Sequence, residues 1–515
     1  MRSRSKKALF NSISSLIYQI VSIISGLILP RLILGAFGSN YNGITTSITQ
    51  FLTFVILLKA GVGGVTKAAL YKPLANNDMD CVSQIIKATE IFLKKVAIIF
   101  AIGLFLLACL YPFIVINEFD WIFSFSLVLI IGMSTFAQYY FGITYQMLLE
   151  ADQNQYIISI ISIISTILNI LIASFLIQSG SNIQLVKFGS GLIFSINPIL
   201  LSIYVKRKYK LRKDIAPNNN AIKQRWDSFA HQVAMMVRDN SDIIILTLIT
   251  NTFEISVYMV YFMVIKAVNN MIRAITNGIG AALGNMLAKG EEKVIRESFQ
   301  MYEVVVYSLS TIIYASTWLL ITPFVQIYTI GITDVNYYRP IFGYTLAVTY
   351  LFFSIRIPYQ DMVEVAGHFK QTKTGAYIEA GLNLLLTIIL GWKFGITGVV
   401  LGTLVAMLFR TVQYAIYSSK NILKRNIWEF LKHIIICGIN IFFIIFICNM
   451  FPIFHVTSYL SWLKYAIIIF CISIIVTLVM DLIFFGSITK SVLQKIVKMI
   501  MGKRGQGNCI SQIMF

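Results

Sequence analysis

The sequence predicts an all-α membrane protein that crosses the bilayer about fourteen times. Hydrophobic residues make up 57% of its 515 residues and charged residues only 12%, with a mean hydropathy of +0.77. These values leave too few polar side chains to cover a soluble globule of this size. The apolar residues gather in runs of roughly 20, which is the length of a helix that crosses a hydrocarbon layer about 30 Å thick. Lys and Arg lie mainly between these runs.

The expected spans fall into two groups, separated by a basic and polar connector. Six precede it, near residues 9–34, 44–70, 88–116, 121–149, 156–178 and 183–205. Eight follow it, near residues 229–251, 255–288, 301–323, 340–363, 375–393, 396–418, 431–451 and 464–486. The N-terminal run has no signal-peptide cleavage site and is interpreted as a retained first helix.

The spans predict five consecutive parts of the chain. Two pseudo-repeated six-helix lobes around a central cavity are followed by two extra helices and a tail. The parts are an N-terminal lobe (1–205), a connector (206–228), a C-terminal lobe (229–418), two extra transmembrane helices (419–486) and a basic amphipathic tail (487–515). The Gly-rich helix ends at 61–75 and 277–288 resemble one another six spans apart, which favours two parallel repeats, although chance similarity of such ends is the alternative.

The distribution of Lys and Arg predicts that both termini and the connector are cytoplasmic. The connector begins Lys206-Arg-Lys-Tyr-Lys-Leu-Arg-Lys213 and continues to Lys223 and Arg225. The opposite loops hold few basic residues: Lys187, Arg339, Lys393 and Lys464. The net charge of +20 therefore indicates loops facing anionic lipid, not a nucleic-acid partner, which would require a basic face on a soluble fold.

Ionisable side chains inside the spans are the candidate functional residues, because each costs several kcal/mol unless it meets a partner or water. The seventh span carries His231, Arg238, Asp239 and Asp242. Arg238 and Asp242 are four residues apart and could neutralise one another on one helix face. That pairing would leave Asp239 without a partner.

The eighth span carries a polar stripe at helical spacing. Lys266, Asn270, Arg273 and Asn277 lie four, three and four residues apart on an otherwise apolar helix. No acid shares the stripe. It therefore either meets an acid from another helix or faces an anionic substrate through water, and we favour the substrate.

The tenth span combines charges with a proline. Arg356, Gln360 and Glu364 share a face, and Pro358 removes a backbone hydrogen bond, so a kink is expected there. Glu364 could instead mark the helix end at the headgroups. Arg31, Lys59 and Arg410 complete the candidate set; Arg31 could snorkel to the outer surface, whereas Lys59 and Arg410 lie nearer mid-span.

Several kinds of site are missing from the sequence. The six cysteines show no spacing typical of disulfides or zinc sites. No phosphate-binding Gly motif is present, so neither ATP nor another cofactor is expected. The outer loops are too short to hold a catalytic domain, so an enzyme is not expected.

The layout and a few motifs resemble a known family. The first helix ends Pro30-Arg31-Leu-Ile-Leu-Gly35 and is followed by Tyr41-Asn42-Gly43. With about fourteen spans and basic inner loops, this resembles the polysaccharide-transport (Wzx-like) flippases of the multidrug/oligosaccharidyl-lipid/polysaccharide (MOP) exporter superfamily. The resemblance in layout covers nearly the whole chain, whereas the residue motifs are loose.

The resemblance implies a function and a location. Such flippases use alternating access to move undecaprenyl-diphosphate-linked oligosaccharides from the inner to the outer leaflet of the bacterial plasma membrane, for O-antigen, capsule or exopolysaccharide. It implies membrane lipids and the lipid-linked substrate as partners, with polysaccharide polymerase and chain-length proteins as further candidates. It also implies a cationic cavity, whose lining is assigned to seven residues: Arg31, Lys59, Arg238, Lys266, Arg273, Arg356 and Arg410.

Two alternative functions stay open from the sequence. One is a cation-coupled drug antiporter of the same superfamily, although its cavity should be acidic or aromatic. The other is a membrane glycosyltransferase or polysaccharide polymerase. Because no ATP motif is present, coupling to H⁺ or Na⁺ through Asp239, Asp242 or Glu364 is a further hypothesis, and transport driven by consumption of the glycan is its alternative.

Overall fold

The computed structural model describes residues 4–55, 62–212, 214–218, 240–276, 279, 283, 286–287, 292–450 and 456–501. Within these ranges the chain is helical and contains no strand. Eleven of the helices are long and apolar enough to cross a membrane, and one of them, Phe369–Asn421, is long enough to cross twice. The chain is a multi-pass, all-α membrane protein, as the sequence predicts.

The helices form two compact units. The first comprises Met1–Met259 with Gly331–Val335, and the second comprises Val260–Ile330 with Asn336–Phe515. Along the sequence, a boundary between the two units falls inside one helix, α10 (Thr252–Thr276). Residues 213 and 219–228 of the predicted connector and most of the Gly-rich end at 277–288 fall outside the described residues, so both stay predictions.

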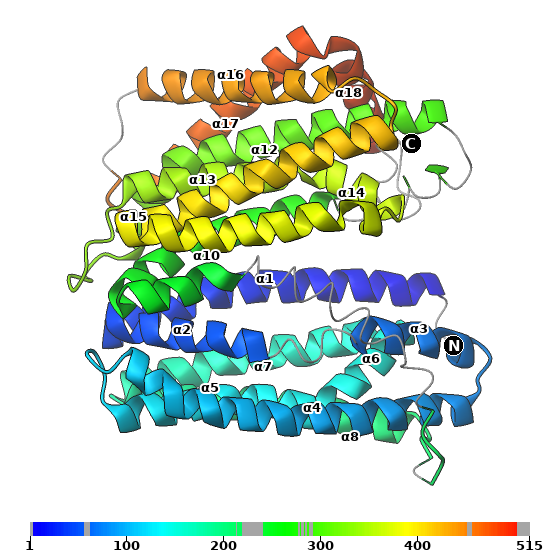
Figure 1. Cartoon of the computed structure of the whole chain (residues 1–515), viewed down its shortest axis with the longest axis vertical. Helices are drawn as coiled ribbons and strands as arrows, with labels where there is room; N and C mark the ends of the chain where they lie inside the picture. Colours follow the sequence, from blue (N-terminus) through cyan, green and yellow to red (C-terminus); the bar gives the residue numbers. More distant parts are fainter. Residues whose placement is uncertain are drawn as a thin grey trace. The chain divides into compact units, whose positions relative to one another are not determined.

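The first unit is a bundle of long helices. Its elements are α1 (Arg4–Phe37), α2 (Ser39–Val55), α3 (Val62–Ala75), α4 (Met79–Ile114), α5 (Trp121–Ala137), the π-helix η2 (Gln138–Gly142), α6 (Ile143–Ala151), α7 (Gln155–Gln178) and α8 (Ile183–Lys208), followed by a short apolar helix at Asn240–Ile249. Helix α5 contacts α4 and α8, and α7 contacts both α1 and α8 (Figure 1). Five of the six predicted spans up to residue 205 coincide with described helices, whereas the span at 44–70 overlaps α2 and α3 and includes residues 56–61, which lie outside the described ranges.

The motif after the first helix closes the packing of this unit. A Cβ atom on Gly43 would lie 1.8 Å from the carbonyl oxygen of Thr252, so only glycine permits this approach. The amide of Asn42 donates to Ser256 Oγ at 2.9 Å, and the ring of Tyr41 packs on Phe119 at a centroid distance of 5.3 Å. Tyr41-Asn42-Gly43 therefore joins α2 to the beginning of α10.

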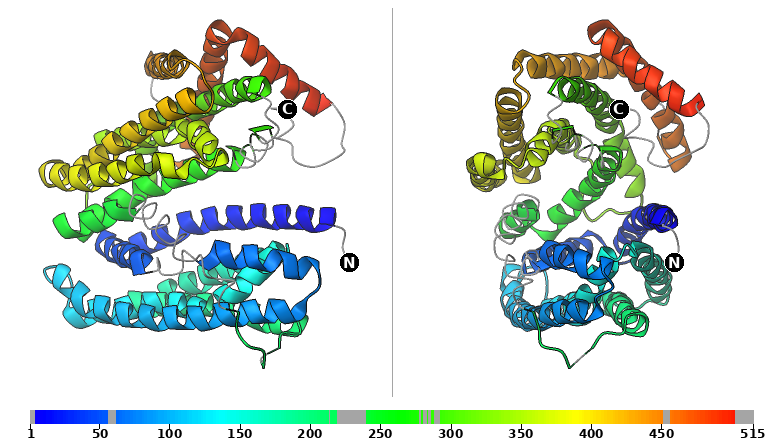
Figure 2. Two further views of the ribbon diagram at one scale, coloured as in Figure 1. Left: turned by 45° about the vertical axis from the view of Figure 1, so that its right-hand side comes forward. Right: turned by 90° about the vertical axis from the view of Figure 1, so that its right-hand side faces the viewer.

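The second unit is built around one buried helix. Its elements are α12 (Glu292–Tyr328), α13 (Pro340–Ile355), α14 (Ile357–Val365), α15 (Phe369–Asn421), α16 (Trp428–Met450), α17 (Tyr459–Phe484) and α18 (Gly486–Met501). Helix α12 contacts α13, α14, α16, α17 and α18, and Figure 2 shows it among them. The two helices predicted as additions to the repeat, α16 and α17, thus share a core with α12.

Helix α15 contains two spans that pack on one another. Gly395 has a positive φ of 58° and reverses the chain between them. On the returning half, Cβ atoms at Gly398 and Gly402 would lie 1.9 Å from Leu390 O and 2.5 Å from Thr387 N. Small residues four positions apart let two membrane helices approach closely. The spans predicted at 375–393 and 396–418 are confirmed as this hairpin.

Candidate functional site

The tenth span is interrupted next to the predicted proline, and an arginine lies at the break. Helix α13 ends at Ile355 and α14 begins at Ile357, with Arg356 between them. Pro358 stands in the first turn of α14, where its missing N–H needs no partner. The Arg356 side chain is 1% exposed and points into the unit.

Arg356 and Arg410 meet at one buried acid, Glu379. Arg356 Nη1 donates to Glu379 Oε1 at 2.8 Å, and Arg410 Nε lies 3.4 Å from Glu379 Oε2. Glu379 is 3% exposed and Arg410 4%. The three residues come from the α13–α14 break and from the two halves of α15, so they connect these segments.

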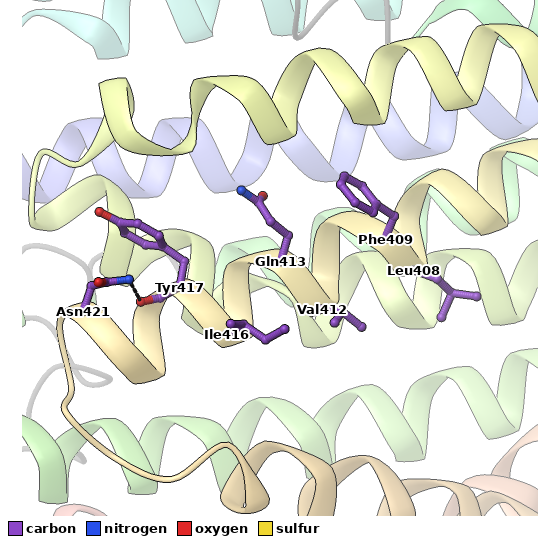
Figure 3. Close-up of a pocket in the computed structure, with 7 residues that line it drawn as sticks. All are labelled: Leu408, Phe409, Val412, Gln413, Ile416, Tyr417 and Asn421. Carbon is purple, nitrogen blue, oxygen red and sulfur yellow. Dashed lines mark hydrogen bonds between the residues drawn. The ribbon is translucent and has the colours of Figure 1, made fainter.

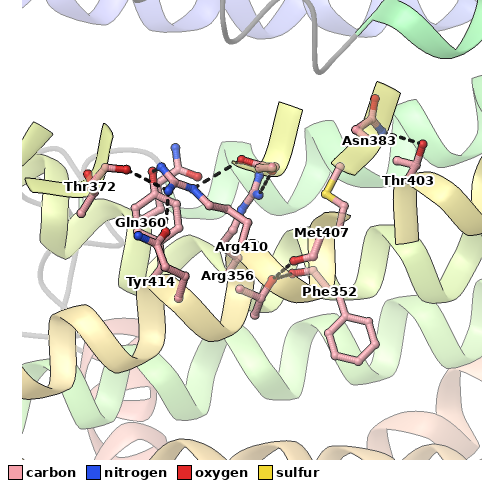
Figure 4. Close-up of polar contacts among 12 residues, drawn as sticks. Phe352, Arg356, Gln360, Thr372, Asn383, Thr403, Met407, Arg410 and Tyr414 are labelled. Atoms are coloured by element: carbon pink, nitrogen blue, oxygen red, sulfur yellow. Dashed lines mark hydrogen bonds and ion pairs between the residues drawn. The ribbon is translucent and has the colours of Figure 1, made fainter. Parts of the chain in front are cut away.

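Arg410 is held by further hydrogen bonds on the same side of α15. Its guanidinium donates to the carbonyl oxygen of Thr372 at 3.0 Å, to the Tyr414 hydroxyl at 2.7 Å and to Gln413 Oε1 (Figure 4). It also lies 4.0 Å from the centroid of the Tyr414 ring. These partners hold Arg410 at the position where it connects the two halves of α15.

Arg273 brings a third guanidinium to this region from α10. Its Cζ lies 4.8 Å from the centroid of the Phe353 ring, and Arg356 Cζ lies 4.7 Å from the same centroid. We call Arg273, Arg356, Arg410 and Glu379 the arginine cluster. Lys266, two turns earlier on α10, is exposed, whereas Arg273 is half-buried. The cluster contains three guanidinium groups and one carboxylate.

The acids near the cluster have different surroundings. Asp361 accepts a hydrogen bond from the Tyr302 hydroxyl at 2.6 Å. Glu364 is exposed near the end of α14 and accepts from Gln360 Nε2 at 2.7 Å. The shared face predicted for Gln360 and Glu364 is thus observed, as is the position of Glu364 at a helix end.

The remaining predicted residues belong to the first unit. Arg31 is half-buried on α1, and its Nη1 lies 3.6 Å from the position of a Cβ on Gly35. Asp242 accepts a hydrogen bond from the Tyr258 hydroxyl at 3.2 Å. Lys59, Arg238 and Asp239 lie outside the described residues, so the proposed pairing of Arg238 with Asp242 stays a prediction.

A surface groove borders the arginine cluster. It has a volume of about 520 Å³ and is lined mostly by apolar side chains of α15, together with Gln413 and Tyr417 (Figure 3). Gln413 also accepts the hydrogen bond from Arg410. The groove therefore joins an apolar surface to the outer edge of the buried charges.

The first unit contains a separate cavity, with several hydroxyl groups in a partly apolar lining, that the sequence did not reveal. It has a volume of about 290 Å³ and is lined by Lys187 of α8 and by hydroxyl groups of α2, α5 and α8. The hydroxyls are those of Thr49, Thr53, Ser134, Thr135 and Ser190. The sequence placed Lys187 among the basic residues of the outer loops, whereas it is the fifth residue of a helix.

Three acids and a loop arginine were also missed as buried residues. Glu379 lies inside an expected span, where an ionisable residue is itself a signal. Glu303 of α12 is fully buried and forms an ion pair with Arg425 of the α15–α16 loop. Asp481 of α17 is 5% exposed. Sequence reasoning had counted Arg425 only as one of the inner-loop charges.

Several solved structures have the same fold as this chain. The lipid II flippase MurJ in an inward closed conformation matches with a TM-score of 0.70 at 17% identity, over 93% of this chain and 99% of that chain. A multidrug resistance MATE family transporter of the MOP superfamily matches in its inward-facing form with a TM-score of 0.58 at 13% identity, over 80% and 95% of the two chains. Its outward-facing counterpart gives 0.55 at 14% identity, over 81% and 95%.

The chain has the fold of these transport proteins. No protein-family profile matches it. No curated protein matches it either. The likeness therefore extends to the arrangement of the helices, and the chemistry must be argued from this chain's own residues.

Proposed function

We propose that this protein is a flippase that moves an undecaprenyl-diphosphate-linked oligosaccharide from the inner to the outer leaflet of the bacterial plasma membrane. The observation that carries the proposal is the arginine cluster, in which two guanidinium groups share one carboxylate and a third lies over the same phenylalanine ring as one of them. A diphosphate has the opposite charge and accepts the bidentate hydrogen bonds that guanidinium groups donate. The lipid II flippase with the same fold supports the same class of substrate.

The proposed roles follow from exposure. Lys266 is exposed and Arg273 is half-buried on the same stripe of α10, so these two are proposed to contact the diphosphate. Arg356 and Arg410 are bound to the buried Glu379, so they are proposed to attract the diphosphate through their positive electrostatic potential without contacting it. The apolar groove on α15 suits a lipid chain. Arg31, Lys59 and Arg238 remain proposed cavity residues of the first unit.

Replacing Lys266 or Arg273 by Gln is expected to lower the flipping rate about tenfold or more while folded protein stays abundant. Each substitution removes charge-assisted hydrogen bonds worth about 1.5–3 kcal/mol. Flipping is measured in proteoliposomes by the access of an added glycan-cleaving reagent to the lipid-linked oligosaccharide. Lys393→Gln, an exposed lysine of the same unit, is the matched control. A loss of folded protein equal to the loss of flipping would mean that the two residues are structural.

The proposed orientation places the connector and both termini in the cytoplasm, because the basic residues of the inner loops determine that direction. A cysteine introduced at Asn219, in a chain without its native cysteines, should react with a membrane-impermeant maleimide only after permeabilisation. Reaction in intact cells would show that the connector faces outward and would contradict the proposed orientation.

A drug antiporter is the second candidate, because MATE family transporters of multidrug resistance share the fold. Such a protein should carry a cationic dye across proteoliposomes in exchange for H⁺ or Na⁺. The positive arginine cluster opposes the binding of an organic cation, so we expect no dye transport. Dye transport without flipping would replace the first proposal by the second.

A further inference from the structure

A small enclosed cavity lies among α12, α16 and α17, away from the arginine cluster. Its volume of about 10 Å³ is close to that needed for a single water molecule. Its polar lining comprises one acid, one amide, three hydroxyl-bearing side chains, an imidazole and a thiol: Asp481, Asn440, Tyr307, Ser308, Thr311, His433 and Cys437. Neither the family resemblance nor the proposed function assigns a role to this cavity.

The hydrogen bonds around Asp481 require one more proton than the side chains supply. Ser308 Oγ lies 2.6 Å from the carbonyl oxygen of Val304 and also within hydrogen-bond distance of Asp481 Oδ2. A hydroxyl group carries one hydrogen, so it can donate to only one of these two oxygens. A protonated Asp481 would donate to Ser308 Oγ, while Ser308 donates to Val304. Both contacts are then hydrogen bonds.

The wall of the cavity also contains a buried amide. Asn440 is 2% exposed, and its Oδ1 is buried and has no hydrogen-bond partner among the described residues. Thr311 Oγ1 lies 3.1 Å from Cys437 Sγ. Within the part of the chain that the structure describes, no Lys, Arg or His forms an ion pair with Asp481. A buried carboxylate in such surroundings is costly, and one proton removes that cost.

The other titratable groups nearby already have partners. Glu303 pairs with Arg425, and His433 Nε2 lies 3.8 Å from Glu303 Oε2. The Tyr307 hydroxyl lies 3.2 Å from the Tyr359 hydroxyl. The ammonium group of Lys432 on α16 donates at 3.1 Å to the carbonyl oxygen of Phe484, which is the last residue of α17. None of these contacts neutralises Asp481.

We propose that Asp481 is a proton-binding site that couples transport to a proton gradient. In the conformation described here the carboxyl group is protonated. When water enters the cavity, the O–H bond breaks, the proton passes to a water molecule to give hydronium, and the carboxylate remains. Asp481 lies three residues before the end of α17, next to the basic helix α18, so the proposed orientation directs this release to the cytoplasm. The coupling rests on the proposed flippase function, whereas the protonation does not.

Infrared difference spectroscopy of the purified full-length protein tests the protonation. Subtracting the spectrum of Asp481→Asn from that of the wild type at pH 7 should leave the carbonyl stretch of a protonated carboxyl group. Asp214→Asn is the matched control, because Asp214 is exposed beside Arg212 and should leave the bands of an ionised carboxylate. Ser308→Ala keeps the carboxyl group and should shift its band. A carboxylate signal from Asp481, or loss of the carboxyl band on adding sodium chloride at constant pH, would overturn the proposal.

Flipping under an imposed pH gradient tests the coupling. A gradient of one pH unit corresponds to about a tenfold change in an equilibrium ratio for each proton coupled, and the wild-type flipping rate should change by up to that factor. The Asp481→Asn variant should give the same rate with and without the gradient. A response that persists in the variant excludes coupling through Asp481. If the wild type does not flip the lipid-linked oligosaccharide at all, the proposed function fails while the infrared result stands.

Discussion

Replacing Glu303 by Gln is expected to destabilise the protein by about 3–5 kcal/mol and to remove most of the folded form. The two terminal nitrogens of Arg425, Nη1 and Nη2, donate to the Glu303 carboxylate, and both side chains are almost fully buried. The Tyr359 hydroxyl donates to the same carboxylate. Without it, Arg425 remains a buried cation over the ring of Phe299, 4.8 Å from the ring centroid. The attraction between this cation and the ring face offsets only part of the cost of burying an unpaired charge.

The measurement is the temperature at which the detergent-extracted protein loses its monodisperse elution peak. Glu297→Gln is the matched control, because Glu297 is an exposed acid on the same helix. The double variant Glu303→Met with Arg425→Met should recover much of the lost stability, since it leaves no unpaired charge. Equal melting temperatures for Glu303→Gln and Glu297→Gln would show that the pair contributes nothing to stability.

The helices could be predicted from the sequence because their signal is local. A run of apolar residues is long enough to span the bilayer wherever the rest of the chain lies, and most of the predicted spans coincide with described helices. Pro358 predicted the break at Arg356 for an equally local reason. The reversal at Gly395 separates the two spans that were placed on either side of it.

The partners of the buried charges could not be predicted, because they come from distant parts of the chain. Arg356 and Glu379 are 23 residues apart, and Arg425 and Glu303 are 122 apart. The hydropathy pattern does not contain the information about which helices are neighbours. Arg425 illustrates the consequence: in the sequence it is a loop cation that favours the cytoplasm, whereas in the structure its charge is neutralised. Lys187 was likewise assigned to a loop and faces a cavity.

Replacing Glu379 by Gln is expected to have an effect of similar size, because one carboxylate serves two arginines. Its loss leaves the arginine cluster with three guanidinium groups and no acid. Arg410 keeps its bonds to Thr372 and Tyr414, but its charge and that of Arg356 then repel one another. We expect a loss of about 3–5 kcal/mol and little folded protein.

The double variant Glu379→Gln with Arg356→Met decides what Arg356 does. It removes one charge of each sign, so the net charge of the arginine cluster is unchanged and stability should exceed that of Glu379→Gln alone. If Arg356 acts only through the potential of the cluster, this variant should flip substrate at nearly the wild-type rate per folded molecule. If Arg356 binds the diphosphate directly, as the sequence predicted, flipping should fall about tenfold or more despite the recovered fold, because a bidentate charge-assisted contact is lost. The burial of Arg356 and its bond to Glu379 favour the first result, and a folded variant that does not flip would refute it.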